Sequence, residues 1–292
     1  MRRPAVIIPV RNRLELTLAC LERLELNGDL HTHEVLVVDD GSTDGTGAMI
    51  ARRHPEVAVR QAGGDLYWGG AIAMGMEELL RPGPRTIFWL NDDCLPQAGA
   101  LETMDRILAE DPGSIAVPRC IDAMSREPWP NGFIGRQRVT GQVGVRRTLD
   151  GASGYCAGVG AAVSAALGPV DAKRFPHYYA DSAYTLRAAR AGFRVVLHGD
   201  ATVELVRPGR PSHQIGEKIV RTESLRENSR RVFAAVNSPF RLGTLFAFQR
   251  LKHGPLLGTL LAAVRTTSWT LQLLNAHLRR TRKADASTGP LE

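Results

Sequence analysis

Short apolar runs alternate with amphipathic segments over the first two thirds of the chain. Short runs dominated by apolar residues, which are expected to form strands, occupy residues 5–10, 34–38, 57–60, 86–90, 114–117 and 193–197. Apolar positions at helical spacing lie between them, over 14–26, 46–53, 69–80, 98–110 and 181–191. Strands that alternate with helices predict βαβ units and a mostly parallel sheet, which binds ligands at the carboxyl ends of its strands.

The remaining segments follow other patterns. Residues 122–150 are rich in Gly, Arg and Pro, which favours hairpins and loops, and 205–216 is a Pro/Gly loop. Helices are expected over 219–236 and 242–278. The predicted organisation is a domain over 1–215 with halves 1–118 and 119–215, a basic amphipathic helical extension over 216–278, and a disordered tail over 279–292.

Composition and charge narrow the classes of protein. An apolar fraction of 43% and a charged fraction of 23% are ordinary for a folded chain. The formal net charge of +7 comes from the C-terminal quarter, since residues 217–283 contain 13 Lys or Arg and three Glu. Such a segment can meet nucleic acid, anionic lipid or an acidic partner, or be a solvated helix pair. Aromatic residues do not interleave with the basic ones, so we expect no nucleic-acid partner.

The spacing of the cysteines and the lengths of the apolar runs indicate the cellular compartment of the protein. Four widely spaced cysteines without a C-x-x-C pair argue against a structural zinc site or a disulfide framework, and favour free thiols in a reducing cytosol. The apolar run over 5–10 is too short for a signal peptide, and no run reaches the ~18–20 residues of a membrane span. A cytoplasmic protein is expected.

Two adjacent carboxylates, Asp92 and Asp93, follow the apolar run 86–90 directly. Adjacent carboxylates repel each other unless a positive charge lies beside them, and Mg²⁺ is typically held by one or two carboxylates and substrate phosphates. Such a cation neutralises a leaving diphosphate. The alternative is an acidic turn that caps the helix beginning near Ala98.

A second acidic pair, Asp39 and Asp40, stands at the end of another predicted strand. An aspartate here can accept hydrogen bonds from a base N–H or a ribose hydroxyl. The alternative is an Asx-turn before a helix. Two acidic pairs at equivalent strand ends of one sheet favour a shared ligand site over two independent caps.

Three strings carry a family resemblance. Val-Ile-Ile-Pro-Val-Arg-Asn over 6–12, Val-Val-Asp-Asp-Gly-Ser-Thr-Asp-Gly-Thr over 37–46 and Leu-Asn-Asp-Asp over 90–93 resemble the inverting family 2 glycosyltransferases. The resemblance implies the GT-A fold, a Rossmann-like α/β sheet flanked by helices, and a nucleotide-diphosphate sugar as donor. It also implies a Mg²⁺ or Mn²⁺ site at Asp93 and Asp92, with the nucleotide beside Pro9, Arg11, Asp39, Asp40 and Asn91.

The glycine-rich segment over 63–71, Gly-Gly-Asp-Leu-Tyr-Trp-Gly-Gly-Ala, looks like a bacterial, rhamnosyltransferase-like subgroup of that family. Glycines let a backbone approach a diphosphate or sugar closely, and the N-terminus of the following helix suits an anion. The resemblance places the donor against Gly64, Asp65, Trp68 and Gly69. The alternative is a plain loop with the tryptophan packed in the core.

The acceptor-side region of the family resembles residues 154–187. The family carries a Glu-Asp pair before a helix there, and one carboxylate is the catalytic base; this chain has Ala180 and Asp181. Asp181 would take the acceptor proton, or else it caps the helix. Many relatives also have a metal- or phosphate-binding His after the next strand, and Glu204, His198 and His213 stay open as candidates.

The resemblance implies transfer of a sugar, with inversion, from a UDP- or dTDP-sugar to a glycan or lipid-linked acceptor in cell-surface polysaccharide or glycoconjugate synthesis. The alternative from another class is a non-catalytic, nucleotide-sugar-binding scaffold at a membrane, which the missing carboxylate at position 180 would suit. A sugar nucleotidyltransferase would have a glycine-rich phosphate loop where Pro-Val-Arg-Asn stands at 9–12, and the G-x-G-x-x-G of dinucleotide oxidoreductases is absent.

Residues 242–274 are strongly apolar and are punctuated by Arg and Lys. A basic amphipathic stretch with aromatic residues can lie in a membrane interface, here on the inner face of the plasma membrane. The alternative is a helical hairpin packed on the main domain or on a second copy of the chain, as a homodimer.

Overall fold

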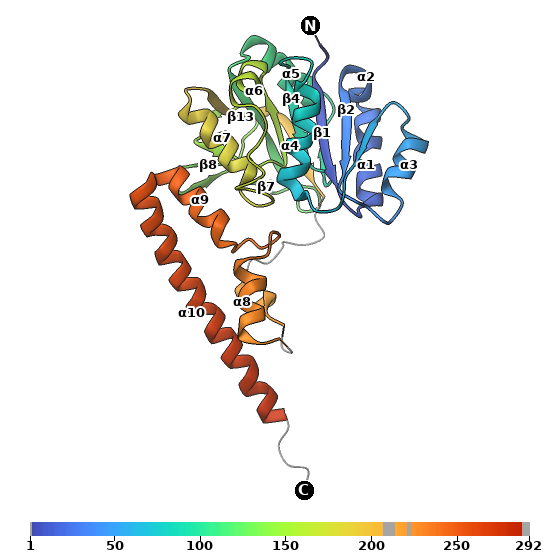
Figure 1. Ribbon diagram of the computed structural model, residues 1–292. Helices are drawn as coiled ribbons and strands as arrows, with labels where there is room; N and C mark the ends of the chain where they lie inside the picture. Colours follow the sequence, from blue (N-terminus) through green and yellow to red (C-terminus); the bar gives the residue numbers. More distant parts are fainter. Residues whose placement is uncertain (1, 207–213, 221–222, 288–292) are drawn as a thin grey trace. The chain divides into compact units, whose positions relative to one another are not determined.

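The computed structural model describes residues 2–206, 214–220 and 223–287. The chain forms two compact units (Figure 1). The first consists of residues 1–176 and 180–208, and the second of residues 177–179 and 209–292. The first unit contains every acidic pair discussed above, so its sheet determines where those side chains meet.

The central sheet of the first unit has the strand order β10-β13-β6-β12-β4-β1-β2-β3, and β5 and β7 pair with β13 and β6. Its strands are β1 Ala5–Val10, β2 Glu34–Asp39, β3 Ala58–Gln61, β4 Ile87–Leu90, β5 Cys94–Pro96, β6 Ser114–Asp122, β7 Pro128–Trp129, β10 Arg146–Thr148, β12 Cys156–Val159 and β13 Arg194–Leu205. A smaller sheet contains β8 Gly132–Ile134, β9 Gln137–Val139 and β11 Gly151–Ala152.

The sheet is parallel in its N-terminal half and mixed beyond it. β4, β1, β2 and β3 pair in parallel, as the alternation of strands and helices predicts. β12 lies antiparallel between β4 and β6. Its chain arrives from the hairpins over 122–150 and not through a crossover helix, and a parallel connection would require such a crossover. The expected α/β fold class is confirmed, with this antiparallel strand at its centre.

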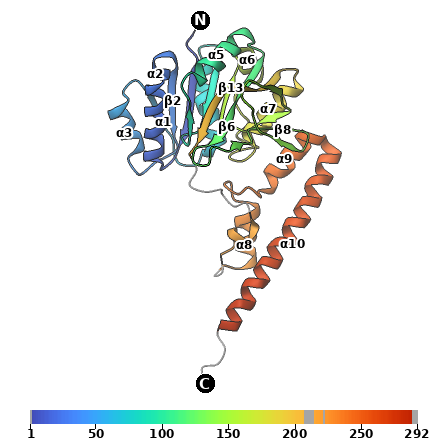
Figure 2. The ribbon, with the colours of Figure 1, turned by 180° about the vertical axis from the view of Figure 1, so that it is seen from behind.

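Helices cover both faces of the sheet (Figures 1 and 2). Val6 and Ile8 of β1 pack with side chains of α1 and α5, whereas Ile7 packs on the opposite side with side chains of α4 and α7. A strand buried on both faces explains the uninterrupted apolar run from which it was predicted. The helices of this unit are α1 Leu14–Leu26, α2 Asp29–Thr32, α3 Thr46–Arg53, α4 Tyr67–Leu80, α5 Ala100–Glu110, α6 Ala161–Leu167 and α7 Ala180–Arg190.

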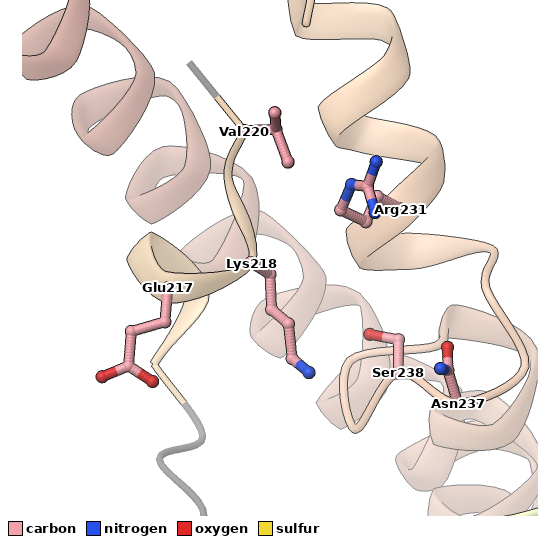
Figure 3. A pocket seen from close by; sticks show the side chains of 6 residues that line it. All are labelled: Glu217, Lys218, Val220, Arg231, Asn237 and Ser238. Carbon is pink, nitrogen blue, oxygen red and sulfur yellow. The ribbon is translucent and has the colours of Figure 1, made fainter. Parts of the chain in front are cut away.

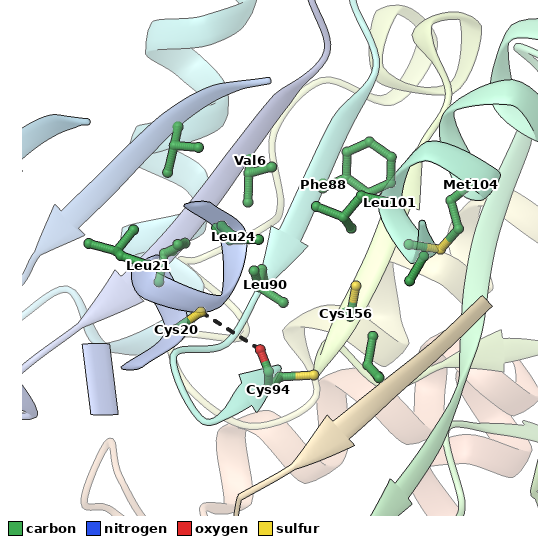
Figure 4. Packing of buried hydrophobic residues seen from close by; sticks show 14 of the residues in the cluster. Val6, Cys20, Leu21, Leu24, Phe88, Leu90, Cys94, Leu101, Met104 and Cys156 are labelled. Carbon is green, nitrogen blue, oxygen red and sulfur yellow. Dashed lines mark hydrogen bonds between the residues drawn. The ribbon is translucent and has the colours of Figure 1, made fainter. Parts of the chain in front are cut away.

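All four cysteines are buried thiols in this unit, and none forms a disulfide. Figure 4 shows three of them between α1, β4 and β12, among Leu21, Leu24 and Phe88. The thiol of Cys20 donates a hydrogen bond of 3.7 Å to the carbonyl oxygen of Cys94. The cysteines therefore serve as small core residues.

The apolar segment over 154–167, for which no single element is predicted, divides into β12 and α6. Gly160 separates the two elements, and a Cβ at this residue would lie 2.3 Å from the carbonyl oxygen of Pro112. β6 and β13 also run further than the apolar runs from which they were predicted, to Asp122 and Leu205. They pair in parallel across a bulge between His198 and Thr202.

The second unit is helical: η1 Ile215–Lys218, α8 Leu225–Phe233, α9 Leu242–His253 and α10 Pro255–Ser287. Its core includes Val232, Phe240 and Trp269. The rings of Phe240 and Trp269 meet edge to face, with their centroids 5.1 Å apart. The helix predicted over 219–236 is shorter, beginning after Ser224, which makes a capping box with Glu227.

The single helix expected over 242–278 is two helices. Gly254 has φ 82° and Pro255 follows it, so the helix breaks there, since proline cannot continue the preceding helix. A disordered tail was expected over 279–292; α10 ends at Ser287, and 288–292 lie outside the described residues. Within the described part of the chain, no helix is long and apolar enough to cross a membrane.

Candidate active site

The candidate site lies where three parallel strands end. β1 pairs with β2 so that Val10 is opposite Asp39, and β1 also pairs in parallel with β4, which ends at Leu90. The loops after these strands therefore emerge at one edge of the sheet. This is the edge at which an open α/β sheet binds its ligands.

The loops after β1 and β2 are bonded to each other. The side-chain oxygen of Asn12, a residue with φ 51°, accepts from the backbone N–H of Thr43 at 2.7 Å. The N–H of Asn12 donates to the hydroxyl of Ser42 at 2.8 Å. Asp44 accepts from the N–H of Leu14 at 3.1 Å, at the start of α1. These bonds make the two loops one preorganised rim.

The two members of the first acidic pair have different surroundings. Asp39 accepts from the N–H of Ser42 at 2.8 Å and from the side-chain amide of Gln61 at 2.9 Å. Asp40, 3% exposed, accepts from three backbone N–H groups of the glycine-rich loop, those of Gly64, Leu66 and Tyr67, at 2.8–3.1 Å. Asp40 therefore shapes the loop and the start of α4, while Asp39, which is 1% exposed, retains lone pairs that its two hydrogen bonds leave unused.

The loops after β1 and β2 lie in close contact with the glycine-rich loop at Gly64. The Arg11 guanidinium, half exposed, donates to the carbonyl oxygen of Gly64 and lies 4.0 Å from the Asp40 carboxylate. Gly41 has φ 72°, and a Cβ there would lie 2.9 Å from the Cα of Gly64. Only glycine fits such a contact without displacement of the loop. Asp65, on the same loop, is exposed.

The second acidic pair meets an arginine. Arg13 makes ion pairs with Asp92 at 2.9 Å and with Asp93 at 3.0 Å. Asp92 is 2% exposed and also accepts from the hydroxyl of Thr17 at 3.3 Å. Burial raises the pKa of Asp92 to about 7, and the nearby charge of Arg13 opposes that rise. Asp93 is more open, with 18% of its side chain exposed.

Replacing Arg13 with glutamine is expected to lower the free energy of unfolding by about 1–3 kcal/mol, because the buried Asp92 and its neighbour lose their positive partner. The matched control is Arg11→Gln. Asp40 keeps its three backbone donors in that variant, so its stability should change by less than about 1 kcal/mol. Urea unfolding of the two variants tests this, and equal losses would show that Arg13 does not stabilise the pair.

Trp68 connects the glycine-rich loop to the second acidic segment. Its indole N–H donates to the side-chain oxygen of Asn91 at 2.8 Å. Its ring meets Trp89 edge to face at 5.9 Å, and Trp89 meets Tyr184 of α7 in the same way at 5.1 Å. The tryptophan is partly buried and bonded to Asn91, and its contact with a donor stays a prediction.

Asp181 joins this cluster through Gly154. The Asp181 carboxylate accepts from the N–H of Gly154 at 2.6 Å and from the N–H of Ser182 at 2.6 Å. A Cβ at Gly154 would lie 2.6 Å from the Trp68 ring and 2.9 Å from the Cβ of Asp181. The two halves of the first unit therefore meet at this glycine. Burial raises the pKa of Asp181, and its backbone hydrogen bonds oppose the rise.

Gly69 lies where α4 packs against the backbone before Asp181. Its N–H donates to the carbonyl oxygen of Pro176 at 2.8 Å, and a Cβ would lie 2.3 Å from the carbonyl oxygen of Phe175. Gly69→Ala is expected to cost about 1–3 kcal/mol of stability through overpacking. Gly63→Ala is the matched control, because its Cβ would make an ordinary contact of 3.7 Å. Thermal unfolding compares them, and an unchanged midpoint for Gly69→Ala would contradict the expectation.

The three residues left open as metal or phosphate ligands have different outcomes. Glu204 accepts from Gln97 at 3.0 Å and from Arg126 at 2.5 Å, so its charge is compensated. His198 is buried on β13, on the order of 20 Å along the strand from Val206, whose N–H donates to the carbonyl oxygen of Asp93. His213 lies outside the described residues.

Within the described ranges, no group of three or more His, Cys, Asp or Glu side chains is arranged to hold a metal ion. A cation here would rely on Asp93, on Asp92 after release from Arg13, and on oxygens of a bound phosphate. Two convergent carboxylates fit a hard divalent cation in this incomplete way. Pro9, the last of the expected donor residues, lies in β1 opposite Val38 and is partly exposed at the same edge.

Sequence reasoning missed Arg13 and the role of Gly154. The signal for Arg13 was available, because a second arginine follows Arg11 two residues later in a loop at the ligand-binding edge. Nothing local indicated that it pairs with carboxylates 80 residues away. The contact depends on the pairing of β1 with β4.

The second unit has a hollow of its own, of about 210 Å³. Figure 3 shows its lining: Glu217, Lys218, Val220, Arg231, Asn237 and Ser238. Arg231 is paired with Glu223, so its charge is already compensated. None of the residues expected in the site lies here, and we assign the hollow no part in it.

The sequence model described as "Glycosyl transferase family 2" matches residues 5–167, more than half of the chain. Among solved structures, GalNAc-T7 with UDP, GalNAc and Mn²⁺ is 12% identical, with a TM-score of 0.62 over 85% of this chain and 48% of that one. The mannosyltransferase PcManGT from Pyrobaculum calidifontis, in complex with GDP-Man and Mn²⁺, is 18% identical, with a TM-score of 0.56 over 99% and 76%. This chain spans about half the length of GalNAc-T7. A search of curated proteins found no match.

Proposed function

The chain belongs to glycosyl transferase family 2, and from this premise we propose that it transfers a sugar, with inversion, from a nucleotide-diphosphate sugar to a glycan or lipid-linked acceptor. UDP- and dTDP-sugars are the donors we favour, and cell-surface polysaccharide or glycoconjugate synthesis is the proposed role. One observation carries the proposal. The strand ends after Val10, Asp39 and Leu90 lie together, and Asp181 reaches their loops through Gly154 and Trp68.

The donor is proposed to lie across the rim formed by the loops after β1, β2 and β4. Asp39 has acceptor capacity for the ribose or base, while Arg11 and the backbone of the glycine-rich loop face the nucleotide. Asp40 acts indirectly, because its carboxylate holds the N–H groups that fix this loop. A nucleoside contact for Asp40 would require release of those bonds.

Asp93 is the proposed ligand of a divalent cation, Mn²⁺ or Mg²⁺, with Asp92 behind it. Both structural neighbours contain Mn²⁺ together with a nucleotide or nucleotide sugar, which supports the proposal. When bound, the cation would neutralise charge on the leaving diphosphate. Arg13 already balances the same carboxylates, so it lies where it can turn to a phosphate oxygen once they have another partner.

Asp181 is the proposed base for the acceptor hydroxyl. Its carboxylate is oriented by two backbone N–H groups and retains lone pairs for a third donor. A raised pKa makes it a stronger proton acceptor than an ordinary aspartate, which favours proton removal as the new glycosidic bond forms. Inversion needs one such base, placed opposite the leaving diphosphate.

Calorimetric titration with UDP, dTDP and GDP, each with and without Mn²⁺, tests the donor site. We expect micromolar binding of one nucleotide, dependent on the cation. Failure of every nucleotide to bind under both conditions would overturn the proposal. A chain that binds its nucleotide but transfers no sugar to any acceptor and does not hydrolyse the sugar nucleotide would instead be a binding scaffold.

A further inference from the structure

Exposed apolar side chains concentrate on one helix of the second unit. Of the fifteen large hydrophobic residues that are exposed in the described chain, eight belong to α10. They are Leu256 at 87%, Leu257 at 52%, Leu260 at 60%, Leu261 at 36%, Val264 at 61%, Leu271 at 62%, Leu274 at 37% and Leu278 at 56%. Scattered exposed leucines need no explanation, but a group of this size on one element does.

These eight residues lie on one side of α10, and we call them the outer face. Leu257, Leu260, Val264, Leu271 and Leu278 follow one another at intervals of three, four or seven residues, the spacing of one helix face. The opposite side is buried within the unit, through Ala262, Trp269 and Leu273. The helix is thus apolar on two sides, and its own unit covers only one of them.

The segment that contains the outer face is basic in sequence, and the nearest acidic residues along the chain are Glu227 and Asp285. Residues 228–284 contain ten Lys or Arg and no Asp or Glu. Arg265 and Arg279 are exposed and stand 14 residues apart, so they share one flank of the outer face. Arg265 lies over the Trp269 ring at 5.4 Å, which holds its charge at the border between the outer face and the buried side of the helix.

We propose that the outer face of α10 lies on an anionic lipid surface. The strip from Leu256 to Leu278 extends about 33 Å along the helix axis, and its leucines would enter the acyl boundary while the flanking arginines meet the head groups. No described helix is long and apolar enough to cross a membrane, and the opposite side of α10 packs in the core of its own unit through Ala262, Trp269 and Leu273. The helix therefore lies along the surface.

A second copy of the chain fits this face less well. Burial of two outer faces against each other would bring the arginines of both copies to the edge of a dry interface. The sequence between residues 228 and 284 has no Asp or Glu that could pair with Arg265 or Arg279 of the facing copy, and like charges at the edge of an interface oppose association. Anionic head groups supply the missing negative charge. Each Arg or Lys near such a surface raises the affinity for the membrane by about fivefold.

Flotation of the full chain with vesicles tests the proposal. The probes are vesicles of phosphatidylcholine alone and vesicles that contain about one third phosphatidylglycerol. We expect the chain to float with the anionic vesicles, binding to fall at least tenfold in 0.5 M salt, and neutral vesicles to bind weakly. The triple variant Leu260→Ser, Val264→Ser and Leu271→Ser should bind at least tenfold less than the unaltered chain.

Two controls separate this role from a general effect. Leu26→Ser with Met124→Ser removes two exposed apolar side chains of the first unit, at 84% and 87% exposure, and should leave binding unchanged. Arg265→Gln with Arg279→Gln should lower anionic binding, whereas Arg136→Gln, an exposed change elsewhere, should not.

Lack of flotation with anionic vesicles, or equal binding by the triple variant, would overturn the proposal. So would a dimer in light scattering that the triple variant converts to a monomer while vesicles stay unbound, since the face would then belong to a second copy. The inference deepens the proposed function by giving a site at which a lipid-linked acceptor is met. It fails independently, because nucleotide titration does not involve vesicles and flotation needs no donor.

Discussion

Replacing Asp93 with alanine is expected to remove the dependence of nucleotide binding on Mn²⁺ and to weaken binding in its presence by about 100-fold or more. The reason is geometric. Asp93 is the more open member of the pair that meets Arg13, with 18% of its side chain exposed, while Asp92 is 2% exposed and also bonded to Thr17. Loss of Asp93 leaves one carboxylate, already paired with the arginine, at the place where a cation would need two.

The measurement is titration of the nucleotide that the unaltered chain binds, at several Mn²⁺ concentrations. Asp200→Ala is the control, because Asp200 is an exposed aspartate on β13, outside the candidate site. If Asp93→Ala bound the nucleotide with unchanged cation dependence, the cation site would have to be assigned elsewhere. His213, which the sequence leaves open as a ligand, would then be the next to test.

Changing Asp181 to asparagine is expected to leave nucleotide binding within about twofold and to reduce transfer by about 10²- to 10⁴-fold, the usual contribution of a general base. Asparagine is nearly isosteric, but its NH₂ group cannot accept a hydrogen bond. One of the two bonds from Gly154 and Ser182 is therefore lost, at a cost of about 1–3 kcal/mol in stability. The assay must be run below the unfolding temperature of the variant.

Asp171→Asn serves as the matched control. Asp171 is a nearby aspartate whose carboxylate is bonded to Arg174 and which we place outside the site, so this variant should transfer normally. Full transfer by Asp181→Asn would show that another group removes the acceptor proton. Loss of both nucleotide binding and transfer would show that the substitution had damaged the site as a whole.

The pH profile gives Asp181 an additional signature. Burial raises the pKa of Asp181, and a protonated Asp181 cannot act as a base. As the pH is lowered, transfer should therefore begin to fall at a pH above the ordinary carboxyl pKa of about 4. The sign for stability is the opposite of that for activity. The folded chain binds this proton more tightly than the unfolded chain, so the contribution of Asp181 to stability is present at low pH and is lost as the pH rises through its folded pKa. The contribution of Asp181 to the pH dependence of stability should disappear in Asp181→Asn.

Much of the fold was predictable because the central strands are buried on both faces. β1, β2 and β4 are nearly continuous apolar runs, and each is followed at once by polar residues. Both acidic pairs could therefore be placed at strand ends, and parallel pairing brings those ends to one edge. The helices predicted over 69–80 and 98–110 end where α4 and α5 end, and their predicted first residues lie two residues from the observed ones.

The rest depended on contacts between distant residues. The antiparallel position of β12 follows from the path of the hairpins before it, and these have weak periodicity. The difference between Asp39 and Asp40 depends on which of them faces the backbone of the glycine-rich loop, more than 20 residues later. The two aspartates are adjacent in the sequence, but Asp40 accepts from three backbone N–H groups of that loop, whereas Asp39 accepts from Ser42 and Gln61.

Because every cysteine is buried in the first unit, and burial raises the pKa of Cys20 and Cys94, the native chain should react very slowly with thiol reagents. The rate at which these thiols are alkylated would then measure how often the core opens, and so the rate of unfolding. Because the native thiols react so slowly, a cysteine introduced at the surface can be labelled selectively. A single added thiol, such as Leu271→Cys on α10, would carry a polarity-sensitive fluorophore alone, and its emission would shift to the blue on entering an apolar environment.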